Sequence, residues 1–215
     1  MSFNNLNKKE EATEQEIPEE IKEVLRMPGQ NLRITGIYGD IDEEKCSETI
    51  YSLFLLSSEK IVVPSDPEDP ESDPIEVSAP IDFYVSSHGG HATEMFSLYD
   101  VMRNVREEVP IHTCGLGKVM SAGVLLLAAG TRGKRKIGKN CRVMIHGVIS
   151  GHAGHLKDVE NEFEEAKITQ KQYVKALASE TDMTESYIRK LMDRKTNVYL
   201  NAEKAVELGI ADIIF

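Results

Sequence analysis

The fold is decided by residues 81–130, IDFYVSSHGGHATEMFSLYDVMRNVREEVPIHTCGLGKVMSAGVLLLAAG. Their hydrophobic spacing and glycines predict, in chain order, a buried strand at 81–85, a turn at Gly89 and Gly90, a helix over 93–105, a strand at 111–114, a glycine turn at 115–117 and an apolar helix over 121–129. Two successive strand–turn–helix units indicate an α/β fold with a mainly parallel sheet covered by helices.

Elements of the same kind flank this stretch. Upstream, the sequence predicts a short helix that begins near Ile17 and ends by Met27, a strand over 32–38 and a helical stripe over 50–55. Downstream it predicts a strand at 141–145, a long amphipathic helix over 156–178, a shorter helix with Thr184 as its N-cap and a last helical turn over 202–208. We therefore expect a single domain over residues 17–215.

Negative charge is concentrated in two segments of this 215-residue chain, whose net charge is −11. Residues 1–20 carry six glutamates against two lysines, and residues 64–76 carry six acidic residues, no basic residue and four prolines. The remaining sequence carries a net charge of about −1, which argues against nucleic acid as the main ligand, because phosphate-binding surfaces are usually basic. We expect residues 1–16 to form a mobile acidic arm and residues 64–76 an exposed loop, inserted between two elements.

One basic run, residues 132–142, contains no acidic residue and is compatible with a phosphate-binding patch. We interpret it as a solvated connection between two buried elements. Three cysteines without paired spacing, and no apolar amino-terminal segment, predict a reducing, cytoplasmic location. The longest apolar stretch, residues 119–129, is about half of the ~20 residues that cross a bilayer, so we expect no membrane partner.

Two turns after predicted strands carry the candidate chemistry, because parallel α/β folds bind ligands at the carboxyl ends of their strands. In the segment 87–90, SHGG, adjacent glycines let the backbone approach a ligand closely. Ser121 starts an otherwise apolar helix, whose amino terminus favours a developing oxyanion. His146 ends the strand at 141–145 and would emerge at the same sheet edge as a base for Ser121. The alternative is that Ser121 is a small residue that permits close helix packing.

Several motifs occur in a fixed order along the chain. Residues 121–130, SAGVLLLAAG, are followed by GKR at 133–135 and RVMIH at 142–146. SHGG at 87–90 and LYDVM at 98–102 precede them, and AEKAVELGIAD at 202–212 follows. From about Leu32 to Phe215, this series resembles the ClpP serine peptidases, with their Ser-Pro-Gly-Gly, Ile-Tyr-Asp-Thr-Met and Ala-Glu-Ala-Val-Gly-Leu-Asp segments.

The resemblance implies the ClpP/crotonase fold of repeated β-β-α and βαβ units. It implies Ser121 as nucleophile, His146 as general base and then acid, and the N–H groups of Gly90 and Ala122 as the oxyanion hole. A peptide or unfolded protein would bind along Gly89 and Gly90 as an added strand. Residues 151–178 would form a protruding handle, a strand and a helix, through which heptameric rings of this chain stack into a 14-mer. No cofactor or metal is implied.

Three features depart from that family. Its triad aspartate falls on Asn197, which can accept a hydrogen bond from His146 but brings no charge, so we expect a slow or conditional enzyme unless Asp193 reaches His146 instead. Lys195 and Thr196 replace an acidic–arginine pair that links the two rings, which weakens the expectation of a double ring. The acidic arm and the insertion argue against docking of the family's AAA+ unfoldase.

Other functions fit parts of the sequence. The pairs His88/His91 and His152/His155 suggest a metal hydrolase, although they lie in glycine-rich turns without a helical zinc motif. Cys114 or Cys141 would be a thiol nucleophile only if accessible, whereas their apolar strands predict buried thiols. A crotonase-type acyl-CoA enzyme would not need Ser121 and His146. Asn197 is also compatible with a catalytically weakened subunit that builds a ring or acts in viral capsid maturation.

Overall fold

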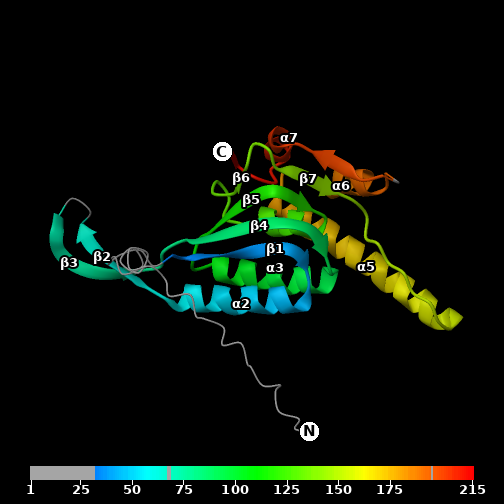
Figure 1. The fold of residues 1–215 in the computed structure, drawn as a ribbon, viewed down its shortest axis with the longest axis horizontal. Helices are drawn as coiled ribbons and strands as arrows, with labels where there is room; N and C mark the ends of the chain where they lie inside the picture. Colours follow the sequence, from blue (N-terminus) through cyan, green and yellow to red (C-terminus); the bar gives the residue numbers. More distant parts are fainter. Residues whose placement is uncertain (1–31, 67–68, 195) are drawn as a thin grey trace, which may run out of the picture. The chain divides into compact units, whose positions relative to one another are not determined.

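A mostly parallel sheet of seven strands organises residues 33–215, which form one of the two units of the chain (Figure 1). The computed structural model describes residues 32–66, 69–194 and 196–215, so the predicted acidic arm and the helix near Ile17 lie outside the described residues. The strand order is β1-β4-β5-β6-β9, with β7 pairing β5 and β8 pairing β7. The strands are β1 (Ile34–Ile41), β4 (Ile81–Gly90), β5 (Ile111–Met120), β6 (Lys136–Ile137), β7 (Arg142–Ile145), β8 (Val198–Leu200) and β9 (Ile213–Ile214). Every pairing is parallel except that of β7 with β8.

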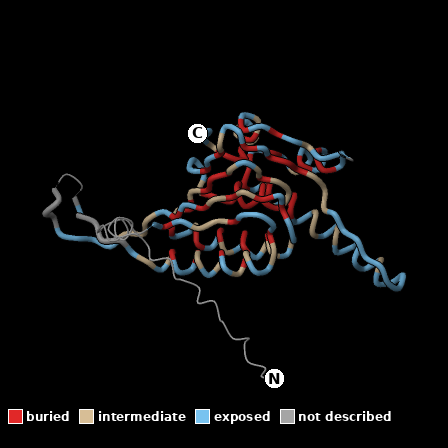
Figure 2. Tube along the Cα trace, viewed as in Figure 1, coloured by how far each residue is buried: buried red, intermediate tan, exposed pale blue. Residues whose placement is uncertain are grey.

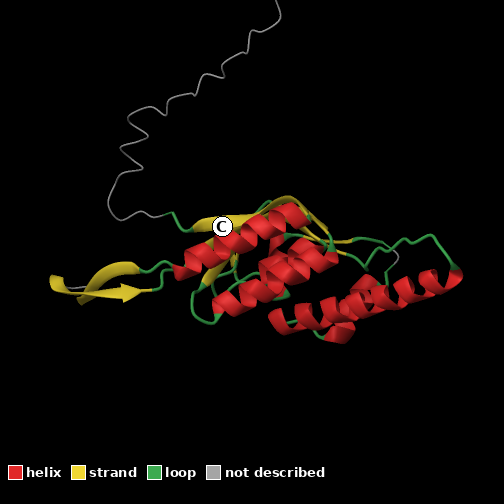
Figure 3. Cartoon of the chain, turned by 90° about the horizontal axis from the view of Figure 1, so that it is seen from below, coloured by secondary structure: helices red, strands yellow, loops and turns green. Residues whose placement is uncertain are grey.

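The helices confirm the predicted alternation of strand and helix. They are α2 (Glu43–Ser58), α3 (Ala92–Arg106), α4 (Ala122–Ala128), α5 (Leu156–Glu180), α6 (Glu185–Met192) and α7 (Ala202–Glu207). Helices α2 and α3 pack side by side against one face of the sheet (Figures 1 and 3). Alternate residues of β4 and the inward stripe of α3 are buried between these layers (Figure 2). Thr184 caps α6 as expected, since its hydroxyl accepts the N–H of Tyr187.

Both glycine turns expected from the sequence are wrong, because the strands continue through them. Gly89 and Gly90 belong to β4 and pair with Asp40 and Ile41 of β1. The segment 115–117 lies within β5. Val85 of β4 pairs with Gly115, and Ser87 pairs with Val119, so β5 has two more residues than β4 between these two pairs and forms a bulge there. Gly117, with φ of +61°, accommodates this bulge.

The acidic, proline-rich segment forms an antiparallel hairpin rather than the expected loop. Strand β2 (Ile61–Asp66) pairs with β3 (Asp69–Val77), and Pro64 lies opposite Pro74. Neither proline has an N–H group to donate, and a two-stranded ribbon with open edges tolerates such a rung. The predicted exposure holds for residues 73–76, which are exposed. That the segment is an insertion relative to the family stays a prediction.

The basic run is not simply a solvated connection. It contains β6, and Arg135 is only 1% exposed. Nη2 of Arg135 lies 2.6 Å from Oδ1 of Asp212. Burial by itself raises the pKa of Asp212, but hydrogen bonds from Arg135 outweigh it and lower this pKa below its usual value. The ion pair with Asp212 therefore neutralises Arg135, so this residue is not available to a phosphate-binding patch.

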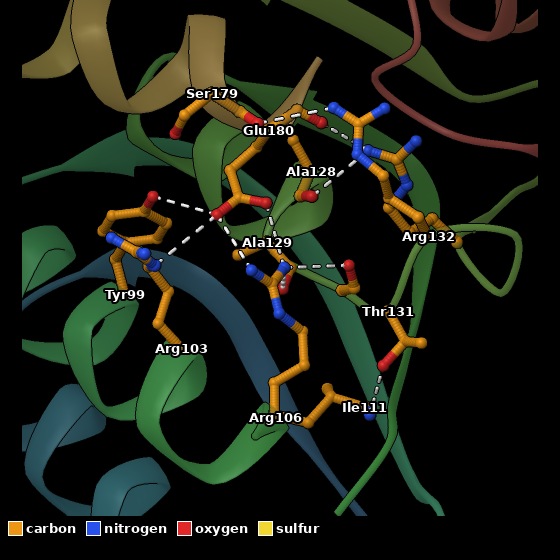
Figure 4. A network of polar contacts seen from close by, with 12 residues as sticks. Tyr99, Arg103, Arg106, Ile111, Ala128, Ala129, Thr131, Arg132, Ser179 and Glu180 are labelled. Atoms are coloured by element: carbon orange, nitrogen blue, oxygen red, sulfur yellow. Dashed lines mark hydrogen bonds and ion pairs between the residues drawn. The ribbon is translucent and has the colours of Figure 1, made fainter.

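A buried carboxylate anchors the carboxyl end of α5 (Figure 4). The side chain of Glu180 accepts a hydrogen bond from the Tyr99 hydroxyl at 3.0 Å and from Nη1 of Arg106 at 2.9 Å. Arg106 also donates to the carbonyl groups of Ala129 and Gly130, just after α4. Helices α3, α4 and α5 are therefore joined at this point.

The helix expected within the handle is present as α5, whereas its role as a handle between rings stays a prediction. Residues 146–155 contain no strand, so the strand expected near Gly151 is not formed within this single chain. The first half of α5 is mostly exposed (Figure 2), including apolar side chains such as Leu156 and Phe163. In the part of the chain that the structure describes, no helix combines the length and the apolar character needed to span a membrane.

Candidate active site

A cavity of about 350 Å³ lies at the carboxyl ends of β4, β5 and β7. It brings together four of the predicted site residues, Gly90, Ser121, Ala122 and His146. The other lining residues are His88, His91, Ala92, Met95, Gly147, Val148, Ile149, Thr169, Tyr173 and Met192. No carboxylate is among these lining residues.

Ser121 occupies a strained turn between β5 and α4. Its φ of 53° and ψ of −122° make it the one non-glycine residue with positive φ in the described ranges. Its N–H donates to the carbonyl of Met144 at 2.8 Å, and its carbonyl accepts the N–H of Val124 at 3.0 Å and the Tyr173 hydroxyl at 3.1 Å. A strained serine between a strand and a helix exposes its Oγ as a nucleophile elbow does. A small residue that served only to permit close helix packing would not need this strained backbone conformation.

At Gly89 and Gly90 neighbouring atoms leave no room for a side chain. Gly89 has φ of +107°, and a Cβ there would lie 2.6 Å from Cβ of Ser121. A Cβ at Gly90 would lie 2.1 Å from the carbonyl oxygen of Ile41. The Ser87 hydroxyl accepts the N–H of Gly89 at 2.9 Å, which holds this end of β4 in place. The close approach of β4 to Ser121 therefore depends on Gly89, and its close pairing with β1 depends on Gly90.

His146 directly follows β7 and is half-buried in the cavity wall. Ile145 pairs with Val198 at the end of the antiparallel ladder of β7 and β8, and His146 and Asn197 are the next residues beyond this last pair. Asn197 is exposed and does not line the cavity. Within the described ranges, no hydrogen bond joins the side chains of Ser121, His146 and Asn197, and Asp193 is an exposed residue at the end of α6. The structure thus brings Ser121 and His146, the predicted nucleophile and base, to one cavity, and no acidic side chain in the described ranges is hydrogen-bonded to His146.

The alternative thiol nucleophiles are buried away from the cavity. Cys114 and Cys141 are 8% and 2% exposed, and neither lines the cavity. Burial raises the pKa of both thiols, that of Cys141 to about 11. The prediction of buried thiols is confirmed. His88 and His91 face the same cavity as His146, but the described residues include no group of three or more histidine, cysteine or acidic side chains placed to hold a metal ion.

Sequence reasoning missed the contribution of α5 to this site. Tyr173 and Thr169 line the cavity, and Gln170 contacts the segment after His146 through the N–H of Val148. The amphipathic pattern predicted the helix, but no local signal indicated which of its polar side chains would meet segments distant in sequence.

The family model for Clp proteases matches residues 72–215. The chain belongs to the Clp protease family. In this Clp protease the match covers the central strands from β4 onward and includes every residue of the cavity. The predicted resemblance and the ClpP-like α/β fold are confirmed, and family membership supports a peptidase.

Proposed function

We propose that this Clp protease is a serine endopeptidase that forms an acyl-enzyme on Ser121. The observation that carries this proposal is the strained Ser121 turn, which shares one cavity with His146. Oγ of Ser121 attacks the scissile carbonyl carbon while His146 accepts its proton, and His146 then protonates the leaving amine. Water, activated by His146, hydrolyses the ester. The N–H groups of Gly90 and Ala122 stabilise the oxyanion, and loss of one such donor costs about 100- to 1,000-fold in rate.

The substrate is a peptide or an unfolded protein. We propose that it pairs with the Gly89–Gly90 end of β4 as an added strand, which presents its carbonyl groups to Ser121. Met95, Val148, Ile149 and Met192 contribute apolar surface to the cavity. This lining favours substrates with an apolar side chain next to the scissile bond, because apolar burial is favourable and requires no polar partner.

The missing carboxylate favours a second candidate. Asn197 is exposed, and no acidic residue lines the cavity. A weakened ClpP-like subunit with a structural role, or with a role in capsid maturation, would retain this arrangement at low activity. The two candidates differ in the rate of peptide hydrolysis and not in the fold.

Assembly into a heptameric ring, alone or stacked as a 14-mer, accompanies this proposal. Family members typically form rings, and the exposed apolar side chains of α5 at Leu156, Phe163 and Ile168 are suited to contact with another copy. A cytoplasmic location stays a prediction from the cysteine content. Nothing in the described residues supports a specific AAA+ unfoldase.

A fluorophosphonate probe tests the nucleophile directly. We expect one adduct per chain, located by peptide mass spectrometry on Ser121 and lost in Ser121→Ala. Ser87 serves as an internal control, because its side chain is fully buried and should stay unlabelled. Labelling with slow peptide hydrolysis identifies the weakened subunit, and native mass spectrometry of the same sample gives its assembly. An unlabelled Ser121 in folded protein contradicts the proposal.

Replacing Gly89 with alanine should lower kcat/KM for a fluorogenic peptide by about 100-fold, because misplacing a reacting group by about 1 Å can cost that much. The new Cβ would lie 2.6 Å from Cβ of Ser121 and 3.2 Å from the carbonyl oxygen of Met120, so the nucleophile must move. Gly133→Ala is the matched control: Gly133 also has positive φ, at +80°, but a Cβ there meets nothing within 4 Å. Equal kcat/KM for the two variants would show that Gly89 does not set the position of Ser121.

A further inference from the structure

One turn of α5 contacts both segments that carry the proposed catalytic residues. The Tyr173 hydroxyl donates to the Ser121 carbonyl at 3.1 Å. Three residues earlier, Oε1 of Gln170 accepts the N–H of Val148 at 3.1 Å, two residues after His146. Side chains three residues apart lie on the same face of a helix. A single helical face therefore connects the nucleophile segment and the base segment.

The Tyr173 contact restrains a strained backbone. Tyr173 is 6% exposed, and burial raises the pKa of its hydroxyl well above the usual value, so it remains a protonated donor. Ser121 holds a positive φ that a serine rarely adopts, and its carbonyl has one other hydrogen bond, from Val124. Such conformations persist only where surrounding contacts hold them. The Tyr173 hydroxyl is one of those contacts.

The Gln170 contact restrains a segment without regular structure. Residues 146–150 belong to no helix or strand. A Cβ at Gly147 would lie 3.2 Å from Oε1 of Gln170, which shows how closely this segment runs along α5. A serine peptidase usually orients its histidine through an acid, and here Asn197 supplies no charge and makes no hydrogen bond to His146 in the described structure. The orientation of the His146 ring then depends more on the backbone of residues 146–148 than it would in an enzyme with a triad acid.

We propose that Gln170 and Tyr173 form a clamp on α5 that sets the distance between Ser121 and His146. Both are positioning residues, because each acts through a backbone group next to a reacting side chain. About two helical turns after Tyr173, Glu180 joins α5 to α3, which gives the clamp a fixed base (Figure 4). This inference rests on the proposed function of Ser121 and His146.

Two single variants and their combination test the clamp. Tyr173→Phe removes one hydroxyl, and Gln170→Leu removes the acceptor for Val148. We expect each to lower the rate constant of fluorophosphonate labelling and kcat by about tenfold, with KM within twofold of wild type, since only the alignment of the reacting groups changes. The double variant should lose much less than 100-fold, because both contacts serve the same alignment. Gln170→Glu retains an acceptor oxygen and should restore most of the labelling rate.

Thr113→Val is the matched control for loss of a buried hydroxyl. Thr113 is fully buried and donates to the carbonyl of Leu127, at the end of α4 remote from Ser121. We expect it to lower the melting temperature without changing the labelling rate. Wild-type labelling rates and wild-type kcat in both Tyr173→Phe and Gln170→Leu would overturn the clamp.

Hydrogen exchange separates failure of the clamp from failure of the proposed function. In the unreacted protein, Tyr173→Phe should speed exchange in residues 119–126 and Gln170→Leu in residues 146–150, whereas Thr113→Val should change neither segment. These measurements do not require activity. If wild type is not labelled, the catalytic proposal fails while exchange still decides the clamp; unchanged exchange in both variants overturns the clamp alone.

Discussion

Replacing Ser121 with alanine will lower kcat for peptide hydrolysis by about 100- to 10,000-fold. Loss of the nucleophile costs about 10⁶-fold in a complete triad, and the missing acid at residue 197 already accounts for about 100- to 10,000-fold of that. Alanine keeps the Cβ and the backbone preferences of serine. Oγ of Ser121 makes no hydrogen bond within the described structure, so little stability depends on it. KM and the melting temperature should therefore change little. Steady-state kinetics with a fluorogenic peptide and a thermal unfolding scan provide the measurements.

The size of that loss distinguishes the proposed nucleophile from its alternatives. Removing Oγ leaves the oxyanion hole intact, so the residual rate should still exceed that of the reaction in water. Cys141→Ser provides a comparison, because the buried Cys141 thiol should contribute nothing to hydrolysis. A Ser121→Ala variant that keeps a tenth or more of wild-type kcat contradicts the acyl-enzyme.

Replacing Asn197 with aspartate should raise kcat by about 100- to 10,000-fold. The upper limit is the loss that the reverse change causes in a chymotrypsin-type triad, a known example rather than a value derived for this protein. Residue 197 directly precedes β8 and His146 directly follows β7, next to the last pair of that ladder, Ile145 and Val198. A carboxylate there can orient the imidazole and stabilise its positive charge during attack. The gain in kcat will be smaller than this upper limit if the carboxylate at the exposed residue 197 does not reach hydrogen-bonding distance of the His146 ring.

The pH profile gives this prediction a second readout. A carboxylate beside an imidazole favours its protonated form. As the pH falls, the neutral imidazole of His146 that is needed for attack is then protonated at a higher pH. The acidic limb of the kcat/KM profile should therefore shift to higher pH in Asn197→Asp relative to wild type. A higher kcat with an unchanged acidic limb would indicate improved orientation without a charge effect.

Asp193→Asn is the matched control, since Asp193 is the other acid considered for this role and is exposed after α6. We expect it to leave kcat within twofold of wild type. If Asp193→Asn instead removes activity and Asn197→Asp adds none, the supporting acid is Asp193 and the assignment of residue 197 is wrong.

Much of the fold follows from local patterns in the sequence. Period-two spacing of apolar residues predicted β4, and period-3.6 spacing predicted α3 and α5, because each of these elements buries one side in the core. Ser121 and His146 were predicted as partners because each follows a strand of a parallel sheet, and the strand ends meet at one edge. The hairpin of β2 and β3 was not predicted, since its prolines and charges are typical of a loop and only pairing across the ribbon makes it regular.

The sequence by itself determined the alternation of strands and helices and indicated Ser121 and His146 as the candidate nucleophile and base, because these depend on neighbours in the chain or on the ends of strands. The close approach of Gly89 to Ser121 came from the tertiary structure. Only the tertiary structure decided that Arg135 is buried against Asp212 and that Asn197 stays out of the cavity. It alone also brought Tyr173 to Ser121 and Gln170 to Val148. These contacts join residues far apart in the chain, so they depend on how α5 packs against α4 and leave no periodic signal in the sequence.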